Sequence, residues 1–305
     1  MKSYKILVTF KTIINFLKKN KKKLPKNFKF NFCNVLQGLK ANELKKKIKY
    51  YDGLICGDDE INEEVLKEAI KLKVVSKWGT GLDSINVDLC KKYKVKVFNT
   101  PGAFTESVAQ LAMAFILGFS REIFQTHFEI KKNNWPKLTG RLLKNQILGI
   151  VGFGKIGSKL ANYANKFKMK IIFYDIKKIN HKKYKQVSLN YLLQNSDYIC
   201  LCCDLNETSI GIIGFDQLKL LKKNSSLINV ARGRLIKEND LILSLKRRLV
   251  KNVALDVFEN EPLQKSSRLR KYENVILSSH NAFNTFENVK RVNENTLNNL
   301  LKVLK

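Results

Sequence analysis

Residues 148–157 read Leu148-Gly-Ile-Val-Gly152-Phe-Gly154-Lys-Ile-Gly157. The first half is typical of a buried strand, and the second half is a G-x-G-x-x-G pattern that opens a predicted helix at Lys155. Gly152 permits the tight turn, Gly154 lets the backbone approach a pyrophosphate without a Cβ, and Gly157 lets helix and strand pack closely. The free N–H groups and the positive dipole end of the helix then face the phosphates. These residues predict a dinucleotide site.

A carboxylate ends the next predicted strand. Asp175 follows the run from Lys170 to Tyr174 and lies 23 residues beyond Gly152. An acid at this place can accept hydrogen bonds from both ribose hydroxyls and repels a 2′-phosphate, which favours NAD over NADP. Lys177 and Lys178 come next and weaken that preference. The alternative is that the glycines only form turns.

Strand-like runs alternate with helix-length segments along the chain, which implies parallel sheets with helices on both faces. In the first third the strands are Tyr4 to Phe10, Phe28 to Asn34, Gly53 to Cys56, Lys73 to Ser76 and Lys94 to Phe98, with helices at Asn42 to Tyr50 and Asn62 to Leu72. After Gln146 six strands are expected, at Ile147 to Val151, Lys170 to Tyr174, Tyr198 to Cys202, Ser226 to Asn229, Asn252 to Leu255 and Asn274 to Leu277. Helices are expected between them, from Lys155 and at Leu189 to Asn195, Phe215 to Leu221 and Glu238 to Leu245. The fold class is therefore α/β, with two doubly wound parallel-sheet domains.

The composition fits a folded chain of two domains. The 305 residues are 44% hydrophobic and 27% charged, close to globular averages. Lys+Arg 57 minus Asp+Glu 26 gives +31, which raises a nucleic-acid or anionic-membrane hypothesis. The lysines are scattered, however, and the one dense run, Lys18 to Lys23, lacks aromatic residues for stacking bases. A solvated surface is expected, without a nucleic-acid or membrane partner.

The six cysteines are expected to be reduced and structural. The apolar run Lys5-Ile-Leu-Val-Thr-Phe10 is too short for a signal peptide, which favours a cytoplasmic protein. Cys200, Cys202 and Cys203 lie in a run typical of a buried strand, where successive side chains point to opposite faces. No second Cys/His group has zinc spacing, so no metal is expected.

The predicted helix that begins at Thr105 or Glu106 is apolar on every side from Val108 to Phe119, except at Gln110. Such a helix must be buried all round, between domains or between subunits. A dimer and a central helix within a monomer are both compatible with this pattern. The stretch is shorter than the about 20 residues that a membrane span needs.

Three polar residues follow predicted strands of the second alternation, at the edge where open α/β sheets bind ligands. His280 is the one of the three histidines that follows a strand, since His127 and His181 lie in charged segments. Arg232 and Glu261 occupy comparable places. Hydride transfer to a 2-keto acid needs a cation to hold the carboxylate and an acid to protonate the oxygen, and Arg232 and His280 fit these roles. Glu261 would orient the imidazole and favour its protonated form.

Six ordered motifs resemble those of the D-isomer-specific 2-hydroxyacid dehydrogenases, from about Tyr51 to the end of the chain. They are Ser76-Lys-Trp-Gly-Thr-Gly-Leu-Asp83, Asn99-Thr-Pro-Gly102 with Ser107-Val-Ala-Gln110, the glycine loop with Asp175, Asn229-Val-Ala-Arg-Gly233, Asp256-Val-Phe-Glu-Asn-Glu-Pro262 and Ser279-His280.

The resemblance implies roles for matching residues. Arg232, Glu261 and His280 fall on the catalytic triad, and backbone amides around Thr80 and Gly81 fall on the substrate-carboxylate site. The residues that fall on cofactor contacts, besides the three glycines, are Lys155, Ile156, Asp175, Cys203, Val230 and Asp256, the last beside the nicotinamide carboxamide.

The resemblance also implies an architecture. A discontinuous, flavodoxin-like substrate domain would comprise residues 1–99 and 282–305, and a Rossmann NAD-binding domain would comprise residues 100–281. A homodimer through the cofactor domains and the Val108 helix is implied too.

Within the family, three segments resemble the phosphoglycerate-dehydrogenase-like branch: Lys77 to Asp83, Pro101 to Thr105 and Cys203 to Ser209. Gln110 and Cys202 depart from the pattern, and Ile55-Cys-Gly-Asp-Asp59 lacks the arginine that often meets the substrate phosphate. The expected reaction is NAD-dependent interconversion of a D-2-hydroxy acid and its 2-keto acid, with 3-phosphoglycerate as a candidate. Glycerate, glyoxylate or hydroxypyruvate are alternatives, and so is an NAD-sensing binding protein without catalysis.

Overall fold

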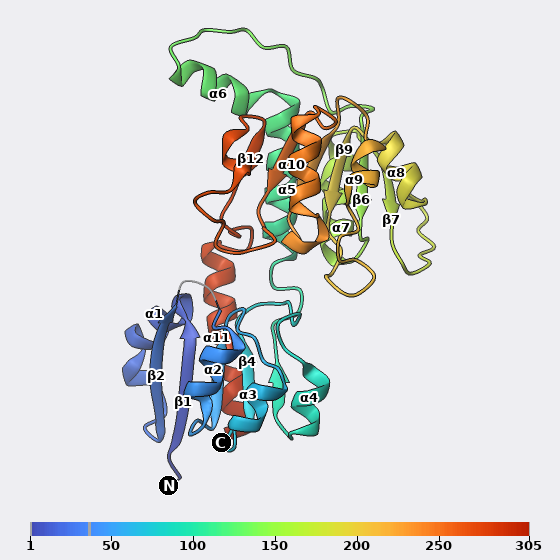
Figure 1. Cartoon of the computed structure of the whole chain (residues 1–305). Helices are drawn as coiled ribbons and strands as arrows, with labels where there is room; N and C mark the ends of the chain where they lie inside the picture. Colours follow the sequence, from blue (N-terminus) through green and yellow to red (C-terminus); the bar gives the residue numbers. More distant parts are fainter. Residues whose placement is uncertain (1, 36–37, 305) are drawn as a thin grey trace. The chain divides into compact units, whose positions relative to one another are not determined.

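The computed structural model describes residues 2–35 and 38–304 and divides into two compact units (Figure 1). The first unit comprises the chain up to Phe104 and the segment from Asn284 onward, and the second comprises Thr105–Phe283. The boundaries expected from the sequence are 99/100 and 281/282, whereas the structure places them at 104/105 and 283/284. Each unit has its own parallel sheet and its own core.

The sheet of the first unit has the strand order β2-β1-β3-β4-β5 in the described residues. All its strands are parallel. The strands are β1 (Tyr4–Phe10), β2 (Phe28–Val35), β3 (Gly53–Cys56), β4 (Val74–Lys77) and β5 (Lys96–Phe98). This is the flavodoxin-like order, so the expected fold class is confirmed for this unit.

Five α-helices of the first unit are described: α1 (Lys11–Lys19), α2 (Ala41–Ile48), α3 (Glu63–Glu68), α4 (Val87–Lys92) and α11 (Phe286–Leu304). The predicted helix from Asn62 to Leu72 is shorter in the structure, because Ala69 leaves the helical backbone region. Helix α1, which buries Ile13, Ile14 and Leu17, was not expected from the sequence.

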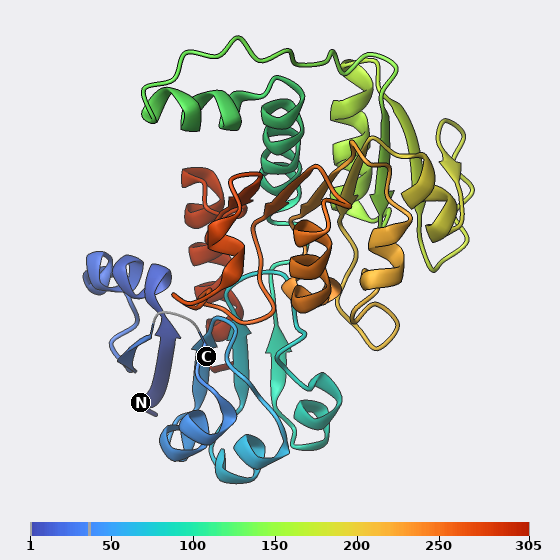
Figure 2. The same cartoon turned by 45° about the horizontal axis from the view of Figure 1, so that its top comes forward.

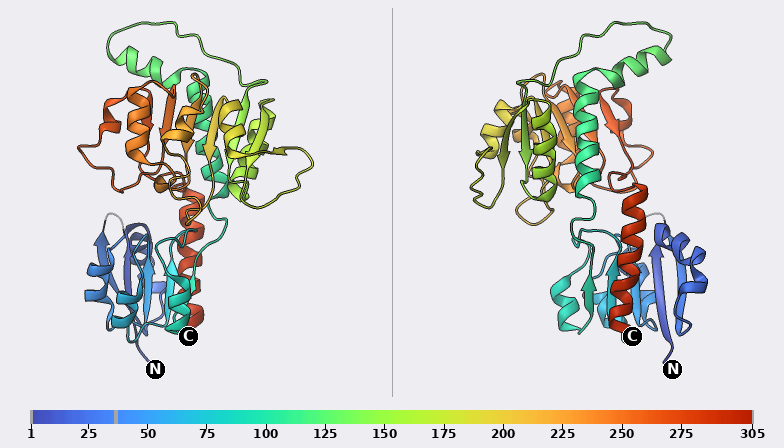
Figure 3. Two further views of the ribbon diagram at one scale, coloured as in Figure 1. Left: turned by 45° about the vertical axis from the view of Figure 1, so that its right-hand side comes forward. Right: turned by 180° about the vertical axis from the view of Figure 1, so that it is seen from behind.

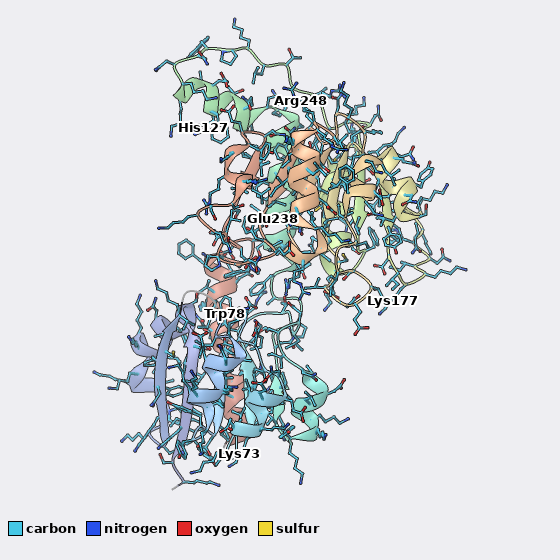
Figure 4. All side chains as sticks on the ribbon, viewed as in Figure 1. Lys73, Trp78, His127, Lys177, Glu238 and Arg248 are labelled. Atoms are coloured by element: carbon cyan, nitrogen blue, oxygen red, sulfur yellow. The ribbon has the colours of Figure 1, made fainter. Side chains whose placement is uncertain are left out.

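The last helix, α11, lies against the first sheet although the second unit separates it from that sheet in sequence (Figure 3). Ser76 at β4 donates a hydrogen bond to the carbonyl oxygen of Thr296, at 2.8 Å. The indole N–H of Trp78 donates to Oδ1 of Asn293, at 2.7 Å (Figure 4). These contacts make α11 part of the first unit, as the discontinuous architecture implies.

The sheet of the second unit has the order β12-β11-β10-β9-β6-β7-β8 in the described residues. The strands are β6 (Ile147–Val151), β7 (Lys170–Tyr174), β8 (Lys185–Gln186), β9 (Tyr198–Leu201), β10 (Ser226–Asn229), β11 (Asn252–Leu255) and β12 (Val275–Leu277). This is the Rossmann order with one further strand at the β12 edge, which confirms the expected fold class. The expectation of six strands is corrected to seven. The two-residue β8 is too short to leave a pattern and is defined by its pairing with β7.

Helices cover both faces of the second sheet (Figure 2, Figure 3). The described α-helices of the second unit are α5 (Thr105–Ser120), α6 (Ile123–Lys131), α7 (Lys155–Lys166), α8 (Leu189–Asn195), α9 (Phe215–Lys219) and α10 (Glu238–Lys246). Short 3-10 turns are η1 (Lys21–Lys23) in the first unit and η2 (Gly233–Leu235) and η3 (Arg268–Lys271) in the second.

The apolar helix α5 packs against α7 and β10 of its own unit. Most of its side chains are buried there, while Glu106, Gln110 and Ala114 stay exposed. Contacts within the second unit therefore account for most of the burial that the apolar composition of α5 requires. No described helix is by itself long and apolar enough to cross a membrane; α5 and α6 pass that test only as a pair, which is bent by 64°.

Candidate active site and dinucleotide site

The three glycines of the loop after β6 have different surroundings. Gly152 has φ +93°, and a Cβ there would lie 2.5 Å from the backbone of Cys203. A Cβ on Gly157 would lie 2.2 Å from the carbonyl oxygen of Gly152. A Cβ on Gly154 would meet nothing within 4 Å. The fold itself therefore requires glycine at 152 and 157, whereas Gly154 leaves a space that a ligand could fill.

Helix α7 begins directly at this space. Gly154 is its N-cap residue and, having no side chain, gives the first turn no side-chain cap. Lys155 is exposed and Ile156 half-buried in that first turn. Uncapped N–H groups at the start of a helix of this length form a site for an anion such as a pyrophosphate. The loop and helix start therefore fit the phosphates of a dinucleotide.

Asp175 is fixed beside the glycine loop. Its Oδ2 accepts a hydrogen bond from the N–H of Phe153 at 2.8 Å, and its Oδ1 accepts one from the N–H of Lys177 at 3.0 Å. The ring of Phe153 stacks on Phe173 of β7, with centroids 4.0 Å apart. The carboxylate thus holds the loop in place. Its contact with a ribose stays a prediction.

Glu261 and His280 form a direct pair. Oε2 of Glu261 lies 2.7 Å from Nδ1 of His280, although the residues are 19 positions apart in the sequence. Both side chains are largely covered, with 17% and 27% of their surfaces exposed. The other oxygen of Glu261 accepts a hydrogen bond from the N–H of Phe258, at 2.9 Å. The carboxylate therefore holds the imidazole in one orientation.

The backbone that carries His280 is held by Asp256. The N–H of His280 donates to the carbonyl oxygen of Asp256 at 2.7 Å. The buried carboxylate of Asp256 accepts hydrogen bonds from the N–H groups of Asn281 and Ala282, at 2.9 and 3.0 Å. His280 itself has φ +52°, a conformation that is unusual for a residue other than glycine. Asp256 thus holds the turn after β12. From the sequence, Asp256 was expected to contact the cofactor, and its role in holding the turn of His280 was missed. The one signal for that role in the sequence is that an acidic residue directly follows a strand.

Arg232 lies at the carboxyl end of β10, beside β11. Its backbone oxygen accepts a hydrogen bond from Asn229, and its guanidinium donates to the carbonyl oxygen of Ala231, at 2.9 and 2.8 Å. The next residue, Gly233, lies so close to the backbone of Phe258 that a Cβ would overlap it, at 1.8 Å. Arg232, Glu261 and His280 therefore follow three adjacent strands at one edge of the sheet, because β10 pairs with β11 and β11 with β12.

The remaining predicted residues lie at strand ends. Cys203 follows β9 and supports Gly152, and burial raises the pKa of its thiol to about 12, so it is a neutral group at physiological pH. Val230 follows β10 and is buried. Thr80 and Gly81 follow β4 in the first unit, where the carbonyl oxygen of Thr80 accepts a hydrogen bond from Asn99 at 2.6 Å. Their contact with substrate stays a prediction.

Cys200, Cys202 and the other two histidines are not among the residues predicted for the site. The Sγ atoms of Cys200, in β9, and Cys202, directly after the end of β9, are 3.7 Å apart. No group of three or more His, Cys, Asp or Glu side chains that could hold a metal occurs among the described residues. His127 and His181 are exposed. His181 stacks on Tyr184.

Residues 113–282 match the family described as "D-isomer specific 2-hydroxyacid dehydrogenase, NAD binding domain". Three curated relatives are similar in sequence. A glyoxylate reductase from Thermococcus litoralis is 35% identical over 66% of this chain and 65% of its own length. A hydroxypyruvate reductase from Thermotoga maritima is 36% identical over 67% and 68%. A D-3-phosphoglycerate dehydrogenase from Methanocaldococcus jannaschii is 34% identical over 69% and 42%.

The fold also matches solved structures over nearly its full length. The structure of a D-lactate dehydrogenase from Aquifex aeolicus with NAD and lactic acid superposes with a TM-score of 0.84 and 27% identity, over 98% of this chain and 95% of that one. The sequence alignments to the first two relatives span about two thirds of each relative. The structural match thus extends beyond the region that the sequences share.

The unequal surroundings of Gly154 and Gly157 make a matched test. Gly154→Ala should melt at the wild-type temperature, because its Cβ meets nothing, but its Kd for NAD should rise at least ~10-fold if the added methyl group displaces the pyrophosphate. Gly157→Ala should lower the melting temperature, because its Cβ overlaps backbone. Scanning calorimetry and NAD titration measure both effects. Wild-type NAD affinity in Gly154→Ala would rule out pyrophosphate binding at this loop.

Proposed function

The chain belongs to the D-isomer-specific 2-hydroxyacid dehydrogenase family, and from this premise we propose that it interconverts a small D-2-hydroxy acid and its 2-keto acid with NAD as the hydride carrier. The observation that carries the proposal is the Glu261–His280 pair, 2.7 Å apart, at the strand edge that also holds Arg232. This reaction needs a general acid, a cation and a cofactor-binding loop. In the second unit, His280, Arg232 and the glycine loop all lie at the carboxyl ends of the strands.

The chemistry divides among the residues as follows. When bound, the nicotinamide ring supplies the hydride that reaches C2 of the keto acid. Arg232 holds the substrate carboxylate and polarises the C2 carbonyl. Nε2 of His280 donates a proton to the carbonyl oxygen as charge develops there, because Nδ1 is held by Glu261. In the oxidation direction, His280 takes the hydroxyl proton.

Preorganisation supports these assignments. Proton transfer depends on a donor fixed to within a fraction of an ångström. The imidazole of His280 is fixed by Glu261, and its backbone by Asp256. We assign the cofactor to the glycine loop, Asp175 and the strand-end residues Cys203 and Val230, with Asp256 next to the turn of His280. Asp175 favours NAD over NADP because its charge repels a 2′-phosphate.

The substrate is proposed from the chemistry of the relatives. The three curated relatives are named for glyoxylate, hydroxypyruvate and 3-phosphoglycerate, which share a 2-keto or 2-hydroxy acid and differ in the group at C3. We therefore propose a small acid of this kind. We assign the backbone amides of Thr80 and Gly81 to the substrate carboxylate, as the resemblance to the family implies.

Removal of the proposed acid or cation should abolish turnover without loss of cofactor binding. We expect His280→Gln and Arg232→Ala to lower kcat/KM for NADH-dependent reduction of glyoxylate or hydroxypyruvate at least about 100-fold, with the Kd for NADH nearly unchanged. His127→Gln replaces an exposed histidine of the same unit and serves as the matched control. NADH absorbance at 340 nm reports the rates. Near wild-type rates in either site variant would refute the role assignment.

We also propose a homodimer through the second unit. Helix α6 and the segment after it extend away from the sheet (Figure 1) and expose large apolar side chains, with 82% of Trp135 and 76% of Leu142 exposed. Exposed apolar side chains in such number are typical of an interface. The others are Ile123, Phe128, Ile130 and Leu138.

A double substitution tests the dimer. The wild-type chain should have twice its 35.2 kDa mass by light scattering during size exclusion. Trp135→Ser with Leu142→Ser should shift the protein toward the monomer, because both side chains lose their apolar contact area. Lys137→Ser in the same segment is the control. A monomeric wild-type protein, or a double variant that stays dimeric, would contradict this interface.

A further inference from the structure

A buried lysine lies at the carboxyl end of β4 in the first unit. Only 3% of the Lys77 side chain is exposed. Its Nζ lies 2.5 Å from Oδ1 of Asp58 and also donates to the carbonyl oxygen of Gly57. Both partners follow β3, which pairs with β4 in the register Cys56 to Lys77. The ion pair therefore joins the ends of two adjacent strands.

The neighbours of this pair hold it in place. The carboxylate of Asp59 is fully buried and accepts hydrogen bonds from Thr9, Gly57 and Leu39, at 2.9, 2.9 and 3.1 Å. The ring of Trp78, which follows Lys77, packs against Phe10 and Phe104. Lys77 is thus held in its position by packing and by its two acceptors.

The charge balance at these strand ends is not positive. Residues 53–60 and 74–83 contain one basic residue, Lys77, and four acidic ones. Asp58 matches the charge of Lys77, and Asp59 adds no positive charge. Glu60 pairs with Lys40, at 2.6 Å. A phosphate ester carries about −1.5 to −2 at pH 7 and needs unmatched cations, which the described segments after β3 and β4 do not supply.

The position of the pair links it to substrate choice. Ligands of open parallel sheets bind at the carboxyl ends of the strands, and Lys77 is three residues before Thr80, where the proposed function places the substrate carboxylate. Resting on that proposed function, we propose that the Asp58–Lys77 pair determines specificity: it accepts 2-keto acids with an uncharged group at C3, such as hydroxypyruvate, and rejects their phosphate esters. The candidate substrate 3-phosphoglycerate is then disfavoured.

The wild-type enzyme gives the first test. We expect kcat/KM for hydroxypyruvate to exceed that for phosphohydroxypyruvate at least ~100-fold, because the ester brings negative charge toward Asp58. An equal or reversed ratio would overturn the inference and leave the proposed function intact. If neither acid nor glyoxylate is reduced while NADH still binds, the proposed function itself fails.

A single substitution then tests the pair. Asp58→Asn keeps the size of the side chain and an oxygen acceptor for Lys77 but removes the negative charge, so a phosphate near these strand ends meets one negative charge fewer. The kcat/KM ratio of phosphohydroxypyruvate to hydroxypyruvate should rise at least ~10-fold. Asp88→Asn, an exposed site on α4, makes the same change in net charge and should leave the ratio unchanged. If the kcat/KM ratio of phosphohydroxypyruvate to hydroxypyruvate is the same in Asp58→Asn and Asp88→Asn, the inference is overturned. If the Asp58→Asn variant does not fold, the same ratio in the wild-type enzyme still tests the inference.

Discussion

The proposed chemistry depends on the hydrogen bonds that the buried carboxylate of Asp256 accepts from the turn of His280. Burying a carboxylate away from water costs free energy unless the group is hydrogen-bonded. Asp256 accepts hydrogen bonds from two backbone N–H groups of the turn after β12. That turn places His280 at φ +52°, a strained conformation that persists only where its surroundings fix it. Glu261 can then meet Nδ1 at 2.7 Å, because both the turn and the segment of Glu261 start from adjacent strand ends.

Much of the second unit could be predicted from the sequence, because its strands are short, largely apolar runs separated by segments of helix length. The bounds of β6, β7, β10 and β11 agree with the prediction. Helix α1 was not predicted because it follows β1 directly and its N-cap residue, Phe10, makes no side-chain cap, so the sequence carries no start signal. The role of Asp256 could not be predicted either, since its partners lie 25 and 26 residues away and only the fold brings them together.

The glycine loop and helix α5 show what a motif alone leaves open. The G-x-G-x-x-G motif does not distinguish among its three glycines. In the structure, backbone contacts require glycine at positions 152 and 157, whereas Gly154 faces open space. The apolar α5 was compatible with burial between subunits or within one chain, and contacts with α7 and β10 now account for most of its burial. A dimer is supported instead by the exposed apolar residues of α6 and the segment after it.

Direct transfer of hydrogen from the cofactor to the substrate carbon is the central claim, and isotope transfer measures it. NADH that carries deuterium at both C4 positions would be incubated with the enzyme and glyoxylate or hydroxypyruvate, and the product examined by mass spectrometry and NMR. We expect one deuterium at C2 and, for hydroxypyruvate, the D enantiomer of the hydroxy acid. A product without deuterium at C2, or with the L configuration, would contradict the proposed mechanism.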